Sequence, residues 1–297
     1  MMRQITLLYD KGAQWEVDYI NLLMEKCNVK KISVFIPELI TMNDESIINN
    51  NILVFSVSEC PNECPFNVIY QIVLKIKPLI IIQLSEEWGG REEYMKLADH
   101  TKLYIRQYNN KDYPINKPNT IQLPLGYMSK MFKSNPLKNR LKPITERLLI
   151  WSFIGRIKSD RQELIDKFKE FNSNYIVNNN ILPIKMAKIY EESIFVPNGR
   201  GNVTLDCFRL YEAVLCGAIP IVVGNEEEIN ITFCYNNNKP PFIYESSWDN
   251  AVTKCKYLLE NKDKLKETQD NIFRWLKDYL EDLQIKIKNI LEPACTG

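Results

Sequence analysis

The segment at residues 193–223 constrains the fold more than any other part of the chain. It begins and ends with short apolar runs, which predict two buried strands. Between them lie a polar turn with Gly199 and Gly201 and a helix predicted to open near Thr204 to Asp206. The order strand, glycine turn, helix, strand is typical of an α/β domain. Free N–H groups and a partial positive charge at such a helix N-terminus suit a diphosphate.

The predicted helix carries a cation and a carboxylate on one face. Arg209 and Glu212 are three residues apart, so both side chains project from the same side, about one turn from the N-terminus. An arginine there suits a phosphate, and a carboxylate suits the hydroxyls of a ribose. The alternative is an exposed ion pair on a surface helix, which contributes little to stability. Spacing alone leaves both interpretations open.

Three motifs in this segment, in this order and spacing, resemble the signature of the exostosin-like glycosyltransferases (glycosyltransferase family 47). They are Phe195-Val-Pro-Asn-Gly, Phe208-Arg-Leu-Tyr-Glu-Ala and Gly217-Ala-Ile-Pro-Ile-Val. Further stretches agree with the resemblance, which covers roughly residues 80 to 250: Phe153-Ile-Gly-Arg with Arg161 behind it, Gln83-Leu-Ser-Glu-Glu-Trp, and Leu123-Pro-Leu-Gly-Tyr.

The resemblance implies a GT-B fold, in which two Rossmann-like parallel-sheet domains flank a cleft. It also implies an inverting transferase that moves a sugar from a UDP-sugar to a hydroxyl of a glycan or glycoside without a metal ion, with arginines and a helix N-terminus stabilising the leaving diphosphate. The chain has no Asp-x-Asp motif of the metal-dependent kind. The motifs are most similar to soluble, virus-encoded xylosyltransferases, which favours UDP-xylose as the donor.

Other functions stay open. UDP-galactose, UDP-glucuronic acid and UDP-N-acetylglucosamine are alternative donors, and a non-catalytic module that binds a sugar nucleotide or glycan is a second class. A nicotinamide-dependent oxidoreductase is disfavoured, because no Gly-x-Gly-x-x-Gly follows the first predicted strand.

The donor-site residues belong to the second half of the chain. Arg156 and Arg161 flank the start of a predicted helix, where a cation opposes the helix dipole unless an anion is bound there. Pairing of Arg161 with Asp160 or Glu163 is the alternative. The complete predicted donor set is Gly155, Arg156, Arg161, Asn198, Gly199, Arg200, Thr204, Arg209 and Glu212.

The first half of the chain alternates apolar strand patterns with helical ones, which predicts a parallel, doubly wound sheet. Ligands of such sheets bind beyond the carboxyl ends of the strands. Glu86 and Glu87 follow a strand predicted at 78–84 and are the candidates for the general base, although a helix-stabilising acidic pair is the alternative. The predicted acceptor residues are Asp10, Trp88, Arg106 and Tyr127. Arg106 pairing with an acid and Tyr127 packing on Pro124 remain alternatives.

The chain of 297 residues has room for two domains. The predicted organisation is an N-terminal acceptor domain at 1–140, a C-terminal donor domain at 141–270, and a helix at 271–297 that crosses back to the first domain. A basic segment interrupted by prolines, residues 135–146, is the predicted linker.

Charge and composition argue against other partners. The net charge is +1 with no block of Lys or Arg, which disfavours nucleic acid and anionic membranes. No run has the length of a membrane span or the pattern of a signal peptide, so the chain is expected to be cytoplasmic and without a membrane anchor. Eight scattered cysteines and a single histidine make a zinc site an unfavourable hypothesis, and no metal is expected.

Overall fold

The computed structural model describes residues 4–57, 66–85, 92–109, 111 and 114–295. These residues form two compact units. The N-terminal unit comprises residues 1–124 and 280–297, and the C-terminal unit comprises residues 125–279. The division thus falls after Pro124, whereas the sequence predicts a boundary at 140/141. The predicted linker at 135–146 is part of the C-terminal unit, and its attachment is described below.

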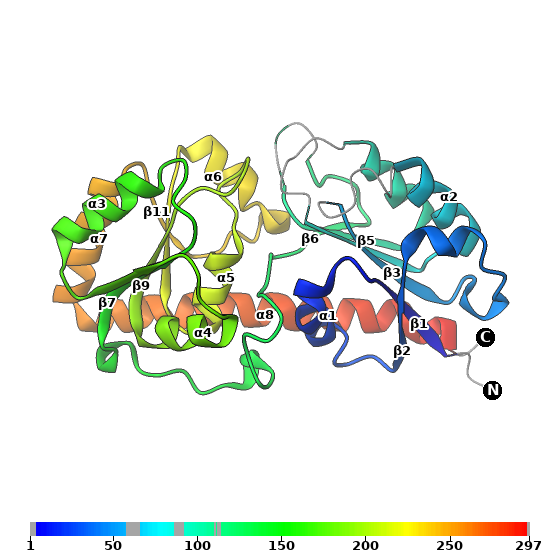
Figure 1. Ribbon diagram of the computed structural model, residues 1–297, viewed down its shortest axis with the longest axis horizontal. Helices are drawn as coiled ribbons and strands as arrows, with labels where there is room; N and C mark the ends of the chain where they lie inside the picture. Colours follow the sequence, from blue (N-terminus) through cyan, green and yellow to red (C-terminus); the bar gives the residue numbers. More distant parts are fainter. Residues whose placement is uncertain (1–3, 58–65, 86–91, 110, 112–113, 296–297) are drawn as a thin grey trace. The chain divides into compact units, whose positions relative to one another are not determined.

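The N-terminal unit is built on a six-stranded parallel sheet in the order β2-β1-β3-β4-β5-β6 (Figure 1). Its strands are β1 (Ile5–Asp10), β2 (Val29–Val34), β3 (Asn51–Ser56), β4 (Ile80–Leu84), β5 (Leu103–Arg106) and β6 (Thr120–Gln122). Its helices are α1 (Val17–Leu23) and α2 (Phe66–Ile76), with 3₁₀ turns η1 (Gln14–Glu16), η2 (Ile36–Ile40), η3 (Glu45–Ile47) and η4 (Glu92–His100). Every residue of β1, β3 and β4 is buried, as expected for strands covered on both faces.

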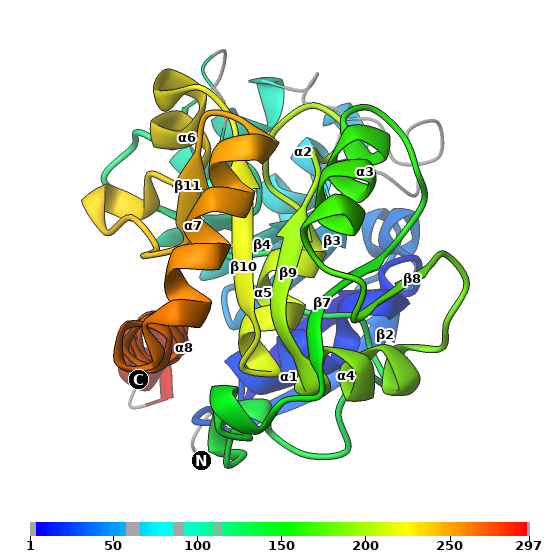
Figure 2. The same ribbon diagram turned by 90° about the vertical axis from the view of Figure 1, so that its left-hand side faces the viewer.

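The C-terminal unit has a five-stranded parallel sheet in the order β11-β10-β9-β7-β8. Its strands are β7 (Leu149–Ile154), β8 (Tyr175–Asn178), β9 (Ser193–Asn198), β10 (Ile219–Val223) and β11 (Ile243–Glu245). Its helices are α3 (Arg161–Phe171), α4 (Pro183–Glu192), α5 (Phe208–Leu215), α6 (Glu226–Thr232) and α7 (Trp248–Glu260), with 3₁₀ turns η5 (Pro136–Lys138), η6 (Ile144–Glu146) and η7 (Tyr235–Asn237). Helices α3 and α7 cover one face of the sheet, and α4 and α5 cover the other (Figures 1 and 2).

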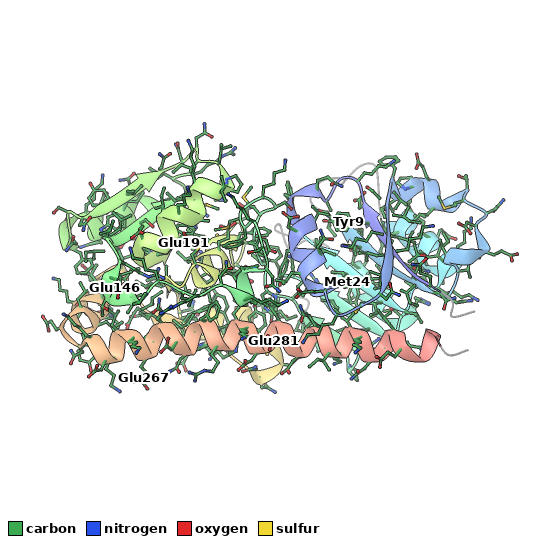
Figure 3. The ribbon with its side chains drawn as sticks, turned by 90° about the horizontal axis from the view of Figure 1, so that it is seen from below. Tyr9, Met24, Glu146, Glu191, Glu267 and Glu281 are labelled. Carbon is green, nitrogen blue, oxygen red and sulfur yellow. The ribbon has the colours of Figure 1, made fainter. Side chains whose placement is uncertain are left out.

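Helix α8 (Lys262–Cys295) contributes to both units. Glu267 and Glu281, labelled in Figure 3, belong to its C-terminal-unit and N-terminal-unit parts respectively. The Gln269 Nε2 donates to the Gly217 carbonyl (2.7 Å), and the Gln284 Nε2 donates to the Leu22 carbonyl (2.7 Å). Each part of the helix is therefore anchored within its own unit. No described helix is both long and apolar enough to cross a membrane.

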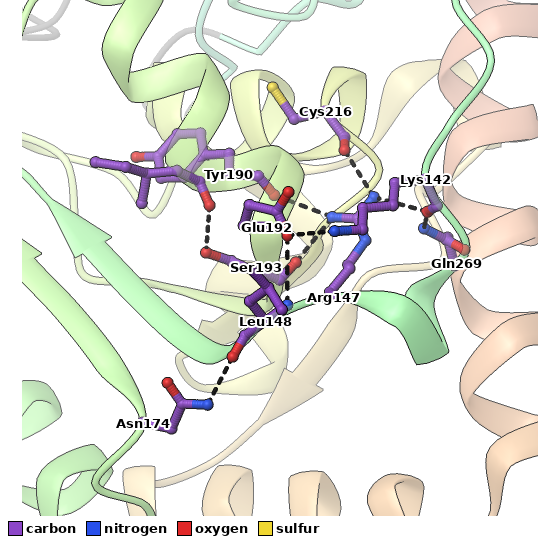
Figure 4. A network of polar contacts seen from close by, with 10 residues as sticks. Lys142, Arg147, Leu148, Asn174, Tyr190, Glu192, Ser193, Cys216 and Gln269 are labelled. Atoms are coloured by element: carbon purple, nitrogen blue, oxygen red, sulfur yellow. Dashed lines mark hydrogen bonds and ion pairs between the residues drawn. The ribbon is translucent and has the colours of Figure 1, made fainter.

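Arg147 attaches the segment before β7 to the amino edge of the C-terminal sheet (Figure 4). Its Nη1 donates to the carbonyls of Tyr190 (3.0 Å) and Ser193 (2.8 Å), and its Nη2 donates to those of Lys142 (3.2 Å) and Cys216 (2.8 Å). Burial lowers the pKa of Arg147 to about 10, and nearby Cys216 and glutamates oppose that shift. The predicted linker is thus held to the sheet by a buried cation.

Each sheet has one point at which the strand order reverses. In the N-terminal unit this switch point lies between β1 and β3, and in the C-terminal unit it lies between β7 and β9. The chain leaves such neighbouring strands in opposite directions, which opens a crevice beyond their carboxyl ends where ligands of α/β sheets bind. The fold therefore directs the search for a site to these two positions.

Candidate functional site

The loop between β9 and α5 closes on itself before the helix starts. The Gly201 N–H donates to the Thr204 carbonyl (2.9 Å), and a Cβ on Gly201 would lie 2.4 Å from the Asp206 carbonyl oxygen. Only glycine allows this approach. Helix α5 begins at Phe208, so the predicted start near Thr204 to Asp206 is wrong. The turn places Thr204 before the helix, with its Oγ1 accepting from the Asp206 N–H (3.2 Å).

Arg209 extends from the first turn of α5 to the β7/β9 switch point. Its Nε donates to the carbonyl of Ile154 at the end of β7 (2.7 Å), and its Nη1 donates to the Oδ1 of Asn198 at the end of β9 (3.1 Å). Nη1 also contacts the Cys207 Sγ (3.3 Å), and the guanidinium carbon lies 4.7 Å from the centre of the Phe153 ring. No hydrogen bond from Nη2 to another described residue has full geometry, although the buried Tyr190 hydroxyl interacts with the guanidinium and helps to raise the pKa of Arg209. The residue is thus fixed in place while one donor group stays available.

Gly155 makes room for that donor group. A Cβ at this position would lie 2.3 Å from the Arg209 Nη2, and the backbone has φ +154°, which side-chain-bearing residues rarely adopt. Gly155 is one of the residues predicted to bind the sugar nucleotide. In the structure its missing side chain and its backbone conformation leave room for the Arg209 guanidinium.

Glu212 lies one turn further along α5 and is buried. Its Oε1 accepts a hydrogen bond from the Met128 N–H (3.3 Å). Burial raises the pKa of Glu212 to about 7, although the Met128 N–H and the positive charge of Arg209 act in the opposite direction. Only 7% of Arg209 and 3% of Glu212 is exposed, so the alternative of a solvent-exposed ion pair does not hold.

Arg161 lies in the first turn of α3 and is buried against the same loop. It donates to the carbonyls of Arg156 (2.8 Å) and Arg200 (2.7 Å). Burial lowers its pKa, and the neighbouring charge of Arg209 lowers it further. Asp160, the proposed alternative partner, instead accepts from the Arg200 N–H (3.0 Å). Arg161 thus joins the loops after β7 and β9, beside Arg209.

The remaining donor candidates surround this pair of arginines. A Cβ on Gly199 would lie 2.4 Å from the Arg161 Cγ, so this glycine allows the two loops to approach. The Arg200 guanidinium is held by both carboxylate oxygens of Glu228, and Arg156 is exposed. The structure therefore brings together all the sequence-predicted donor residues in one unit, although their role in binding remains a prediction.

Asp206 was missed by the sequence analysis, in which it served only to mark the helix start. It is buried, and its Oδ1 accepts hydrogen bonds from the Tyr211 hydroxyl (2.8 Å) and the Cys207 N–H (3.0 Å). The Tyr211 hydroxyl also meets the Tyr235 hydroxyl. Burial raises the pKa of Asp206 to about 7, against the effect of its two hydrogen bonds. An acidic residue before a helix is usual at a cap, so no local signal indicated this buried network.

The N-terminal candidates occupy different places. Glu86, Glu87 and Trp88 lie outside the described residues. Asp10 ends β1 and Arg106 ends β5, and both are buried. Tyr127, which belongs to the C-terminal unit, is buried with its ring 5.1 Å from that of Phe132 in an edge-on contact. These roles also stay predictions.

The sequence comparison found one relative among curated proteins. No family model matches the chain. Human ribitol-5-phosphate xylosyltransferase 1 is 23% identical over an alignment of 212 residues, and the match covers 61% of this chain and 46% of that protein. The chain therefore spans about half the length of this relative, and membership of the exostosin-like family stays a hypothesis.

Comparison of structures shows the fold. An α-glucosyltransferase in complex with UDP-glucose and DNA containing an abasic site has a TM-score of 0.58 at 12% identity, covering 96% of this chain and 99% of the other. Anabaena HepE in complex with UDP has a TM-score of 0.57 at 9% identity, covering 98% and 100%. The β-glucosyltransferase of phage T4 has a TM-score of 0.52 at 12% identity, covering 97% and 99%. The two parallel-sheet units have the GT-B fold of these enzymes, and the predicted fold class is confirmed.

Proposed function

We propose that this protein is an inverting glycosyltransferase that moves a sugar from a UDP-sugar, UDP-xylose in the first instance, to a hydroxyl of a glycan or glycoside. The proposal rests on the position of Arg209. Its Nε and Nη1 are anchored to the ends of β7 and β9, and its Nη2 points to no acceptor with full hydrogen-bond geometry. A buried, fixed cation at a switch point is suited to the diphosphate of a nucleotide. The relative and the solved structures, which include complexes with UDP and UDP-glucose, support a nucleotide-sugar donor.

The diphosphate would bind where two kinds of positive group converge. Arg209 supplies its Nη2, and the N-terminus of α5 supplies the partial positive charge of a helix start. As the bond between the sugar and the diphosphate breaks, negative charge grows on the leaving UDP, and groups already fixed in place stabilise it without reorganising. The metal-independent mechanism proposed here assigns this task to the protein's own cations.

Glu212 would recognise the ribose of the donor. Its Oε1 is held by the Met128 N–H, which leaves the second carboxylate oxygen for the ribose hydroxyls. The acceptor hydroxyl must lose its proton on the face of the sugar opposite the leaving UDP, and a carboxylate of the N-terminal unit would accept it. The sequence offers Glu86, Glu87 and Asp10 for this role.

Incubation with a panel of UDP-sugars in excess EDTA tests the proposal. The panel contains UDP-xylose, UDP-galactose, UDP-glucuronic acid and UDP-N-acetylglucosamine, with release of UDP as the measurement. We expect release with at least one sugar in the presence of EDTA, and a large loss of release in Arg209→Ala. Activity that disappears with EDTA and returns with manganese would contradict the metal-independent mechanism.

The second candidate function is a module that binds a sugar nucleotide without transferring the sugar. It uses the same donor site and differs only in its lack of a working base. UDP binding by calorimetry with no UDP release from any donor would favour this module over the transferase.

A further inference from the structure

Asp206 is a buried carboxyl at the start of helix α5. It lies one residue before the N-cap Cys207 and is 1% exposed. Its Oδ1 accepts from the Cys207 N–H (3.0 Å) and from the hydroxyl of Tyr211 in the first turn of the helix (2.8 Å). The carboxyl therefore ties the loop after β9 to the helix, and the function proposed above gives it no task.

The second oxygen of this carboxyl is buried without a partner. The Asp206 Oδ2 makes no hydrogen bond among the described residues. Burial removes the water that stabilises a negative charge, so a buried carboxylate needs hydrogen bonds or a cation in its place. An unpaired hydroxyl costs less than an unsolvated charge, and the surroundings of Asp206 therefore suit its protonated form better than its ionised form.

The titratable groups around Asp206 include no cation. The Tyr211 hydroxyl is shared with the hydroxyl of Tyr235 in η7, and Cys207 adjoins Asp206 in the chain. Burial, and then the charge of Asp206, raise the pKa of Tyr244 in β11. Burial likewise raises the pKa of Asp206 to about 7, against the effect of its two hydrogen bonds. The carboxyl thus changes its charge near neutral pH in a setting without a compensating cation.

The loop that contains Asp206 also holds Arg209 in place. The Cys207 Sγ lies 3.3 Å from the Arg209 Nη1, and the Asn198 Oδ1 accepts from the same Nη1 (3.1 Å). The Asn198 Nδ2 in turn donates to the Leu205 carbonyl (3.2 Å). Leu205 and Cys207 are the two neighbours of Asp206 in the chain. Both residues that flank Asp206 therefore belong to the contacts that fix the guanidinium.

The charge of Asp206 opposes the charge of a diphosphate at this place. An ionised carboxylate just before the N-cap occupies the favourable potential of the α5 N-terminus. It also repels a bound anion, and the repulsion is strong where little water screens it. The neutral form leaves the positive end of α5 and the Arg209 guanidinium to the ligand. A proton on Asp206 and a diphosphate should therefore increase the affinity for each other by the same factor.

We propose that Asp206 is a positioning residue of the donor site and that the diphosphate binds while Asp206 is protonated, which couples donor affinity to a proton. This inference rests on the proposed binding of a sugar nucleotide at Arg209. Above neutral pH, one proton passes from the buffer to an Asp206 carboxylate oxygen as the donor binds. The proton returns to the buffer when UDP leaves.

The test measures donor affinity against pH in the wild type and in Asp206→Asn, which stays neutral. The ligand is UDP-xylose, or UDP-glucose if UDP-xylose does not bind. A UDP-sugar keeps a constant charge on its diphosphate from pH 6 to pH 8, whereas the terminal phosphate of free UDP titrates near pH 6. We expect the ratio of the wild-type Kd to the Asp206→Asn Kd to rise about threefold to tenfold over this range. Taking the ratio removes the contribution of Glu212, which both proteins contain.

A count of protons gives the coupling directly. Calorimetry in buffers with different enthalpies of ionisation measures the protons taken up on binding. At pH 7.5 the wild type should take up about half a proton more per bound donor than Asp206→Asn, which corresponds to a proton affinity about tenfold higher in the donor-bound protein. A residue that only stabilises the loop would change the Kd by one factor at every pH and leave the proton count unchanged. Asp270→Asn, at an exposed aspartate of α8, is the matched control and should behave as the wild type.

Tyr211→Phe provides a second measurement that does not depend on the folding of Asp206→Asn. It removes a hydroxyl that donates to the Asp206 Oδ1 and favours the ionised carboxyl, so the pKa of Asp206 should rise further. We expect the pH at which donor affinity declines to move upward by about half a unit to one unit. Tyr257→Phe, at an exposed tyrosine of α7, should keep the wild-type midpoint.

The outcomes separate this inference from the function on which it rests. If neither UDP nor either UDP-sugar binds to the wild type at any pH, the proposed donor site itself is wrong. If a UDP-sugar binds but the Kd ratio and the proton count do not differ with pH, or the midpoint stays in place in Tyr211→Phe, the coupling through Asp206 is overturned. A Kd ratio that falls as the pH rises would also overturn it, because the donor would then prefer the ionised carboxyl.

Discussion

Two buried arginines of the C-terminal unit, Arg147 and Arg209, lie at opposite edges of the same parallel sheet. Each fits against a glycine: a Cβ on Gly217 would lie 2.5 Å from the Arg147 Nη2, and one on Gly155 would lie 2.3 Å from the Arg209 Nη2. Arg147 donates to four backbone carbonyls at the amino edge. Arg209 uses Nε and Nη1 at the carboxyl edge, where its Nη2 makes no hydrogen bond with full geometry to another described residue.

The two arginines differ in what they bind, and we propose that Arg147 stabilises the fold whereas Arg209 binds a ligand. At the amino edge, both Nη atoms of Arg147 bind chain segments that are distant in sequence, so the cation organises the fold. At the carboxyl edge, Arg209 is held through Nε and Nη1, and its Nη2 is the group that we propose binds an anion. Burial of a charge is therefore no sign of function by itself. The Arg147 Nε is also buried without a partner among the described residues, so what distinguishes Arg209 is its place at the switch point of the sheet.

The largest expected effect is on stability, in Arg147→Met. Four backbone carbonyls, three of them in buried hydrogen bonds, would lose their donor, so we expect the free energy of unfolding to fall by about 3–5 kcal/mol in urea titrations. The folded fraction should bind UDP with wild-type affinity. Arg140→Met, at an exposed arginine in the segment before β7, should change stability little. A loss of UDP affinity in folded Arg147→Met would break the division between the two edges.

The second prediction concerns the buried carboxyls of the carboxyl edge. Folding raises the pKa of Asp206 from 3.8 and that of Glu212 from 4.5, each to about 7. Between these limits the folded state keeps protons that the unfolded state has lost, so stability should fall as the pH rises from about 4 to about 7. Asp206→Asn should remove on the order of 3 kcal/mol of this fall, measured by urea titration at several pH values. Glu226→Gln, at an exposed glutamate, is the control, and an unchanged pH dependence in Asp206→Asn would refute the assignment.

The third prediction is the counterpart of the first. Arg209→Ala should weaken UDP binding by about 1–3 kcal/mol, because it removes a charge-assisted hydrogen bond to the diphosphate. Glu212→Ala should have a similar but smaller effect through the ribose. Calorimetry with UDP measures both, and equal affinity in the two variants and the wild type would rule out this donor site.

The smallest expected effects come from the paired glycines. Gly155→Ala should displace the Arg209 guanidinium and lower UDP affinity by about 1 kcal/mol, whereas Gly217→Ala should lower the melting temperature and spare UDP affinity. A backbone cost at both positions is expected, since Gly217 has φ +75°. If the two substitutions affect UDP affinity equally, Gly155 does not act through Arg209.

The local sequence was sufficient to predict the architecture and the presence of helix α5, although not the residue at which that helix begins. Short apolar runs alternating with amphipathic segments indicate parallel α/β units, because strands covered on both faces must be apolar throughout. The helical period places Arg209 and Glu212 on one face of α5, whatever the rest of the chain does. These inferences depend only on neighbours a few residues apart.

Only the tertiary structure decided which buried polar groups are paired within the fold and which keep unpaired atoms. Arg209 meets a carbonyl 55 residues away, Arg147 meets one 69 residues away, and Glu16 meets Ser85 across 69 residues. Strand order also sets the two switch points, and thereby brings Asp10 beside Ser56 and Arg209 between β7 and β9. Hydrogen bonding between distant segments decides whether a buried polar group is satisfied, and the spacing of residues along the chain does not record those partners.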